Sequence, residues 1–159
     1  NQKRNTIAWQ SCDTLYFETE QRTIKKPLIG LIPGPDTLIN NIFYHTSLET
    51  KTKLNKELLS VTVINNQNLS KEALIERVKE ELKLSCNIET LKFIKHYHIA
   101  KALPKLNDLK YNPLPLETRL SQKVFIAGDT QLNGSLNAAM ISGERAALDL
   151  IEVLSNDTL

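Results

Sequence analysis

The sequence predicts an α+β fold, a mainly antiparallel sheet followed by a terminal strand and helix of the α/β type. Strand-like segments follow one another without helices between most of them, which favours antiparallel pairing. The last apolar strand leads straight into a long helix, as in nucleotide-binding α/β domains. We therefore expect a sheet with one helix (about 70–84) over residues 1–104, a linker over 105–122 and a strand–helix segment over 123–159.

Five segments have the composition of strands: 7–18, 28–32, 39–48, 58–64 and 91–99. The segment 58–64 is the clearest, because its apolar residues alternate with Ser60 and Thr62. Asp13 and Thr14 predict a turn within the first segment, and Pro-Gly-Pro-Asp at 33–36 predicts a turn after the second. In the last segment we expect one shared face made of Leu91, Phe93, Tyr97 and Ile99.

Two amphipathic helices are expected. Ser70 is a good N-cap, and Leu74, Val78 and Leu82 follow at four-residue spacing, which predicts a helix of about four turns. The second helix covers 135–154 and carries one apolar stripe: Leu136, Met140, Gly143, Ala147, Leu150 and Leu154. This stripe is expected to leave water by packing on the chain's own sheet or on a second copy, so a homodimer stays open.

Composition narrows the class of protein. The net charge of +2 gives no reason to expect nucleic acid as a partner, and no apolar run approaches the roughly 18 residues of a transmembrane segment. No signal peptide is evident, so we expect a cytoplasmic protein with Cys12 and Cys86 as free thiols, although a disulfide between them stays open. The chain starts at Asn1 and has one methionine, Met140, which predicts a piece of a longer protein.

The segment 124–147 carries the clearest chemistry. Four apolar or small residues end in Gly128, whose missing Cβ lets a ligand approach the backbone. Asp129 follows at the strand's carboxyl end, where α/β folds place ligands and where a carboxylate can accept hydrogen bonds from hydroxyls. Gly134 and Ser135 then open the helix, whose first N–H groups suit a phosphate or a carbonyl.

This segment resembles the C-terminal FAD motif of the flavin-containing amine oxidase superfamily, which includes monoamine oxidases, phytoene desaturases and protoporphyrinogen oxidases. The shared pattern is an apolar strand, Ala-Gly-Asp, a short loop, Gly-Ser, and a helix with Ser-Gly and Ala-Ala. Weaker similarity upstream lies at 40–42, 59–61 and 102–104. The resemblance implies that residues 1–104 form a substrate domain and that 123–159 belong to an FAD-binding domain.

The resemblance also implies roles for residues in FAD binding. Asp129 would bond a ribityl hydroxyl or lie beside the pyrophosphate, and Gly128 would let the cofactor pass. The N–H groups around Ser135, Leu136 and Asn137, after Gly134, would face the pyrimidine edge of the flavin and stabilise its reduced form through the helix dipole. The implied activity is that of an FAD-dependent dehydrogenase or oxidase, which transfers hydride from a C–N or C–C bond of a small-molecule substrate.

One part of the family pattern is missing. The five glycines include no two that are two residues apart, so the sequence lacks the GxGxxG turn that holds the pyrophosphate. We therefore expect FAD in an intact parent protein and no tightly bound FAD in this 159-residue chain. The catalytic residues, the substrate and the electron acceptor are not assigned, and a non-catalytic α+β binding module that keeps a relic of the motif is the alternative.

Weaker signals come from histidines and tyrosines. His96 and His98 share a strand face at a spacing that can bind a metal, but hydrogen-bonded or exposed histidines are expected instead, so no metal site is assigned. Tyr97 and Tyr44 either line a substrate pocket or pack in the core or at its edge.

Overall fold

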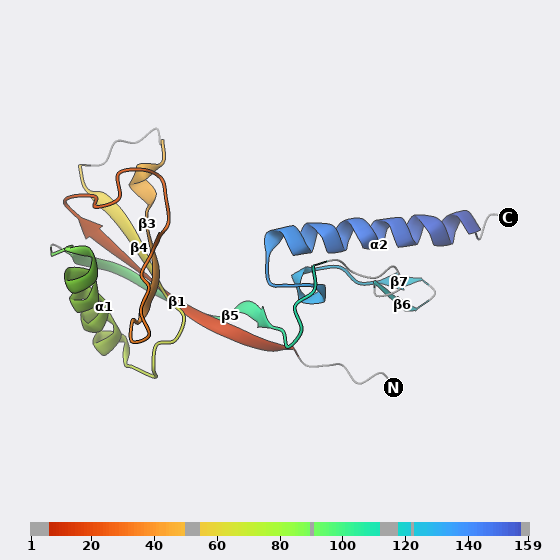
Figure 1. Cartoon of the computed structure of the whole chain (residues 1–159), viewed down its shortest axis with the longest axis horizontal. Helices are drawn as coiled ribbons and strands as arrows, with labels where there is room; N and C mark the ends of the chain where they lie inside the picture. The colour runs from red at the N-terminus through yellow and green to blue at the C-terminus, as the bar shows by residue number, and fades with distance from the viewer. Residues whose placement is uncertain (1–6, 50–54, 90, 112–117, 122, 157–159) are drawn as a thin grey trace. The chain divides into compact units, whose positions relative to one another are not determined.

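The computed structural model describes residues 7–49, 55–89, 91–111, 118–121 and 123–156, which divide into two compact units. The sheet unit comprises Ser11–Ala102, and the helix unit comprises residues 1–10 with 103–159. Figure 1 shows the elements in chain order: β1 (Ala8–Thr19), β2 (Gly30–Leu31), β3 (Ile39–Tyr44), η1 (His45–Ser47), β4 (Glu57–Val63), α1 (Lys71–Cys86), β5 (Lys92–Lys105), β6 (Arg119–Ser121), β7 (Val124–Phe125), η2 (Asp129–Gln131) and α2 (Leu136–Asn156).

The sheet unit is built on a five-stranded sheet in the order β2-β3-β4-β1-β5. Strand β4 pairs antiparallel with both β1 and β3, and β2 pairs antiparallel with β3. Across these strands Phe43, Ser60 and Tyr16 lie opposite one another in one row. The α+β fold with a mainly antiparallel sheet is therefore confirmed.

The core lies between this sheet and α1, which runs along one face of it (Figure 1). Alternate residues of the central strands are buried, because a strand turns every second side chain to the same face. They pack with the apolar stripe of α1 in one cluster whose main members are Leu15, Phe17, Leu59, Val61, Val63, Leu74, Val78 and Leu82. Each large side chain buried here stabilises the fold by roughly 1.5–3 kcal/mol.

Polar contacts fix the ends and the position of α1. The Ser70 hydroxyl accepts a hydrogen bond from the Ala73 N–H at 3.2 Å, as expected for the N-cap, and Asn87 ends the helix in the left-handed conformation. Glu81 is buried on the inner face, and its two carboxylate oxygens accept from the N–H groups of Leu38 at 2.9 Å and Ile39 at 3.0 Å. One helical side chain thereby anchors the start of β3.

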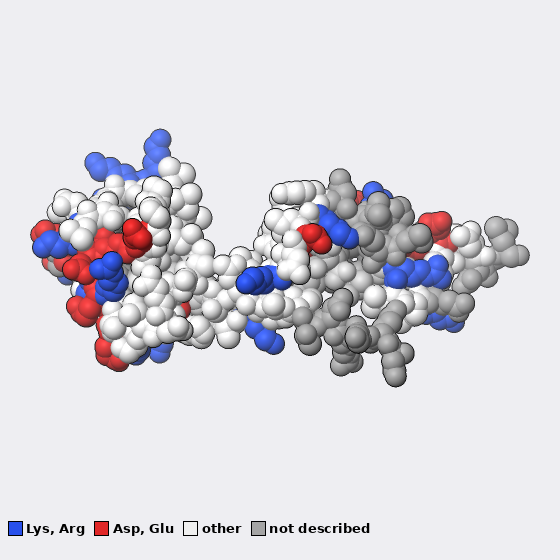
Figure 2. All heavy atoms as spheres, turned by 60° about the horizontal axis from the view of Figure 1, so that its bottom comes forward, with Lys and Arg blue, Asp and Glu red and all other residues white. Residues whose placement is uncertain are grey.

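The outer face of α1 is charged. Arg77 pairs with Glu80 at 3.3 Å and Lys79 with Glu76 at 2.9 Å, both at i,i+3 spacing. Figure 2 shows acidic and basic side chains gathered on the side of the sheet unit where α1 lies. This solvated face agrees with the amphipathic pattern of the sequence.

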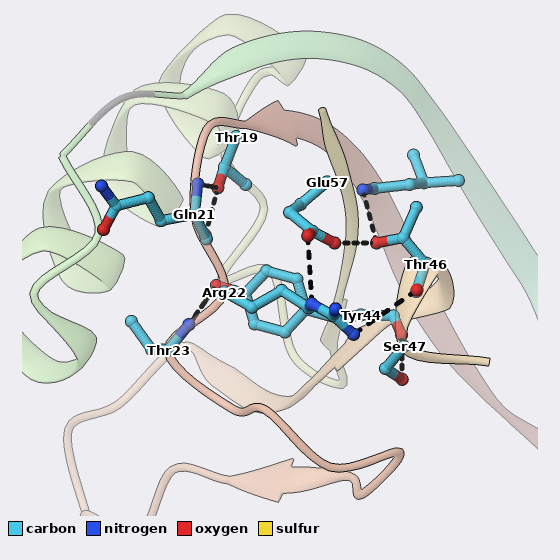
Figure 3. Close-up of polar contacts among 9 residues, drawn as sticks. Thr19, Gln21, Arg22, Thr23, Tyr44, Thr46, Ser47 and Glu57 are labelled. Carbon is cyan, nitrogen blue, oxygen red and sulfur yellow. Dashed lines mark hydrogen bonds and ion pairs between the residues drawn. The ribbon is translucent and has the colours of Figure 1, made fainter. Parts of the chain in front are cut away.

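A second polar network joins the segment after β1 to η1 and β4 (Figure 3). The Arg22 Nε lies 3.0 Å from one carboxylate oxygen of Glu57, and the Thr46 hydroxyl donates to the other. Arg22 also donates to the Thr46 carbonyl at 3.4 Å, and the Thr23 N–H donates to the Tyr44 hydroxyl at 3.4 Å. Tyr44 itself is a core residue, 1% exposed.

Two strand expectations are wrong. The predicted turn at Asp13 and Thr14 is absent, because β1 is continuous and the buried Asp13 carboxylate has partners on neighbouring segments. Phe93 and Tyr97 do not share a face: Phe93 contacts the core ring of Phe17, whereas Tyr97 contacts Tyr16, the neighbour of Phe17 on the opposite face of β1.

The helix unit contains an antiparallel pair, β6 and β7, followed by η2 and α2. Strand β6 lies inside the segment expected as a linker. The apolar strand expected before Gly128 is shorter and more exposed than its composition suggests, since β7 covers only two residues and Val124 is 52% exposed. Its one partner in the described part of the chain is the short β6, so little apolar surface covers it.

Helix α2 packs within its unit through small residues, of which Ala138 and Ser142 are buried. The large residues of the predicted stripe are exposed instead: Leu136 77%, Met140 66%, Leu150 41% and Leu154 57%. In this unit they stay exposed because its loop lies against the small-residue side of the helix, where the Gly128 N–H donates to Ser142. Their packing on the sheet or on a second copy stays a prediction.

Candidate functional site

The segment 126–137 of the helix unit brings together the residues for which the resemblance implies cofactor contacts. Gly128 has φ +139°, a region that L side chains rarely adopt, and a Cβ placed there would meet only the Thr130 hydroxyl, at 3.9 Å. The Gly128 N–H donates to the Ser142 hydroxyl at 3.2 Å. The chain thus turns sharply here, close to α2, with open space beside the turn.

Asp129 begins η2 directly after this turn and is half-buried. Its backbone carbonyl accepts from the Leu132 N–H at 3.1 Å, which closes the short helix. Within the described ranges its carboxylate has no hydrogen bond or ion pair, so both oxygens can accept from a ligand hydroxyl.

The start of α2 is capped by Ser135. Its hydroxyl accepts from the Ala138 N–H at 3.2 Å and donates to the Asn133 side-chain carbonyl at 2.6 Å. Leu136 and Asn137 are exposed, and N–H groups in the first turn of a helix have no intrahelical partner and carry partial positive charge. The helix start therefore offers donors to an electron-rich group.

Gly134 has a packing role. A Cβ there would lie 3.2 Å from Pro104 Cδ and 3.3 Å from Leu103 Cδ2, so the glycine lets the turn before α2 lie against the end of β5. The residues present fit one edge of FAD, with a free carboxylate for a hydroxyl and helix N–H groups for the flavin's electron-rich edge. A turn for the pyrophosphate is not among these residues.

The sheet unit has a second candidate surface, on the face away from α1. Four rings form what we call the aromatic face: Tyr16, Phe43, His45 and Tyr97. Tyr16 contacts the Tyr97 ring edge-on at 6.0 Å between centroids and the His45 ring at 5.8 Å, and His45 contacts Phe43 at 5.1 Å. Tyr97 is 52% exposed. Of the two tyrosines considered for a pocket, only Tyr97 lies at this surface.

A hollow of about 210 Å³ lies on the same sheet unit. Of its lining residues, Glu18 follows Tyr16 by two positions on β1, and Leu58 is the residue of β4 that pairs with Glu18. Its lining consists of Glu18, Asn55, Lys56, Glu57, Leu58 and Ile94. Sequence reasoning missed this hollow, because Ile94 comes beside Glu18 and Leu58 only through the pairing of β5 with β1.

The two histidines of β5 lie within hydrogen-bonding distance of the buried Asp13 carboxylate. His96 Nε2 lies 2.7 Å and His98 Nδ1 3.1 Å from the same oxygen of Asp13, and the Asn66 amide donates to the other oxygen at 3.0 Å. Among the residues that the structure describes, no group of three or more His, Cys, Asp or Glu side chains is arranged to hold a metal ion. The sequence signal that could have found this cluster is an acidic residue inside an otherwise alternating strand.

Both cysteines are free, as expected. Burial raises the pKa of the Cys12 thiol, with a further contribution from Asp13. Burial also raises the pKa of the Cys86 thiol, and the nearby Glu81 carboxylate adds to the effect. Neither environment activates a nucleophile. No described helix combines the length and the hydropathy that a membrane span requires.

Comparison with known proteins gives structural likeness alone. No protein-family model matches the chain, and no curated protein matches it. A protein from Pyrococcus furiosus, PF1083, aligns with 95% of this chain and 32% of its own, at 16% identity and a TM-score of 0.53. An oxidoreductase from Methanosarcina mazei aligns with 94% of this chain and 35% of its own, at 16% identity and a TM-score of 0.55.

At this identity the likeness shows a shared fold. The chain spans about a third of the length of either solved structure, since it covers 32% of one and 35% of the other.

Proposed function

We propose that this chain is the C-terminal portion of an FAD-dependent oxidoreductase. The observation that carries the proposal is the Asp129 carboxylate, unpartnered within the described residues, between the open turn at Gly128 and the capped start of α2. When bound, FAD would accept a hydride equivalent from a C–N or C–C bond of the substrate.

The chain's own residues bind and orient the cofactor in this proposal. Asp129 accepts a hydrogen bond from a cofactor hydroxyl, and Gly128 leaves room for it to pass. The N–H groups of the first turn of α2, around Leu136 and Asn137, lie at the positive end of the helix dipole. They would hold the pyrimidine edge of the flavin and favour its electron-rich reduced form.

Two comparisons support the proposal. One of the structures that shares the fold is named an oxidoreductase. Both shared-fold structures are about three times as long as this chain, which leaves room elsewhere in a parent protein for the glycine-rich turn that this sequence lacks. The exposed leucines and the exposed methionine of α2 would pack on that missing domain.

The test is to express the chain together with the sequence upstream of Asn1 in its gene and to measure flavin absorbance after purification. We expect stoichiometric FAD in the longer protein and no tightly bound FAD in the 159-residue chain. A longer protein that stays colourless in excess FAD, or an upstream sequence without a dinucleotide-binding βαβ unit, contradicts the proposal.

The second candidate is a non-catalytic α+β binding module. The absence of a GxGxxG turn from this sequence favours it. If the gene begins just before Asn1 and the protein binds no FAD, this second function is the better account.

A further inference from the structure

The sheet face away from α1 carries two neighbouring rows of side chains. In the first row Phe43, Ser60 and Tyr16 lie opposite one another, and the Tyr97 ring meets the Tyr16 ring edge-on. In the second row Leu58 lies opposite Glu18. The hollow lies over this second row, and Tyr16 comes two residues before the lining residue Glu18 on β1.

The floor of the hollow is apolar. Leu58 is half-buried and Ile94 is 47% exposed, and both line the hollow. Its volume of about 210 Å³ suits a molecule of one ring and a few further atoms. Covering these side chains would remove apolar surface from water, which favours binding.

The chain's own lysines already occupy the groups that attract cations. The Lys95 ammonium lies 5.8 Å from the centre of the Tyr97 ring. Lys56 and Lys92 each lie 3.9 Å from the same carboxylate oxygen of Glu18. A cationic ligand would compete with these lysines, whereas an anionic ligand would face the Glu18 carboxylate.

The second carboxylate of the lining is also engaged. Glu57 is held by the Arg22 guanidinium at 3.0 Å and by the Thr46 hydroxyl (Figure 3). Apart from the Asn55 amide, which also lines the hollow, apolar contact is therefore what it still offers to a ligand.

We infer that the hollow binds an uncharged, apolar molecule of about one ring and that Leu58 and Ile94 determine this selectivity.

The test is an NMR titration of the ¹⁵N-labelled 159-residue chain with three probes of one ring size: benzyl alcohol, benzylamine and benzoate. We expect benzyl alcohol to shift the backbone amide signals of Glu18, Leu58 and Ile94 in a saturable way. The charged probes should bind at least about fivefold more weakly, because neither finds a free counter-charge. Equal or tighter binding of benzylamine overturns the inference.

A matched pair of variants locates the site. Ile94→Thr replaces an apolar group of the lining and should weaken benzyl alcohol binding about three- to tenfold, the effect of roughly one apolar carbon group. Ile29→Thr makes the same change at an isoleucine of the sheet unit that is 64% exposed and outside the hollow, and should leave binding unchanged. Equal effects of the two variants would also overturn the inference.

These titrations contain no flavin, so their outcome does not depend on whether the proposed function is correct. Selective binding of benzyl alcohol by a protein whose longer form takes up no FAD would retain the hollow as a ligand site and reject the oxidoreductase. FAD uptake without probe binding would support the oxidoreductase and reject the hollow as a ligand site.

Discussion

Glu81 is expected to hold the sheet unit together through two backbone contacts. It is 7% exposed on α1, and it accepts hydrogen bonds from Leu38 and Ile39, themselves 6% and 1% exposed. Glu81→Ala leaves both N–H groups buried without an acceptor, at about 1–3 kcal/mol each. We expect the free energy of unfolding to fall by about 3 kcal/mol, since some water will enter the space left behind.

Urea unfolding followed by far-ultraviolet circular dichroism measures this loss. With an m-value of about 2 kcal/mol per molar, a loss of about 3 kcal/mol lowers the urea midpoint by about 1.5 M. Hydrogen exchange at the Leu38 and Ile39 amides should accelerate in parallel, because both lose their acceptor.

Glu80→Ala is the matched control, since Glu80 directly precedes Glu81 on the same helix and forms an exposed ion pair with Arg77. Surface pairs of this kind contribute roughly 0–1 kcal/mol. If the two variants unfold at the same urea concentration, the carboxylate does not anchor β3 and the reasoning is wrong.

Three further predictions concern single side chains. In the longer FAD-binding protein that we propose, Asp129→Ala should raise the dissociation constant of FAD about tenfold to hundredfold, the value of one charge-assisted hydrogen bond. The same change at the exposed Asp108 should leave the constant unchanged, and flavin titration measures both. Asp13→Ala should lower the free energy of unfolding by about 2–4 kcal/mol, because the side chains of Asn66, His96 and His98 lose their acceptor. A urea midpoint equal to that of the unchanged 159-residue chain would refute this. The raised pKa of Cys86 favours the neutral thiol in the fold, so its contribution to stability is present at neutral pH and is lost as pH rises through the raised pKa; alkylation should be slow in the fold and fast in urea.

Local pattern was sufficient for much of the fold. The alternation at 58–64 predicted β4, and the Ser70 cap with its four-residue apolar spacing predicted α1. Such features depend on neighbours within one turn or one strand, so they can be read before the chain path is known. The faces of β5 could not be predicted in this way. The side chains of Phe93 and Tyr97 lie on opposite faces, where they contact Phe17 and Tyr16 of β1.

The candidate site divides in the same way. The order of Gly128, Asp129 and Ser135 was legible in the sequence, and the capped helix start follows from it. That Gly134 serves packing against Pro104 required the structure, as did the exposure of the α2 stripe. Neither the packing of Gly134 nor this exposure follows from the periodicity of the sequence. An apolar stripe shows which residues a helix can bury, but it does not show whether another element covers them.

The sequence by itself therefore determined the class of fold, the order of its main elements, the helix cap and the order of Gly128, Asp129 and Ser135 in one short segment. The tertiary structure alone decided that Asp13 is a buried acceptor for His96 and His98, 83 and 85 residues away, and that Glu81 of α1 holds the start of β3. The physical reason is separation along the chain. Alternation and capping act over a few residues, whereas a buried charge is stable only where the folded path brings its hydrogen-bond partners to it.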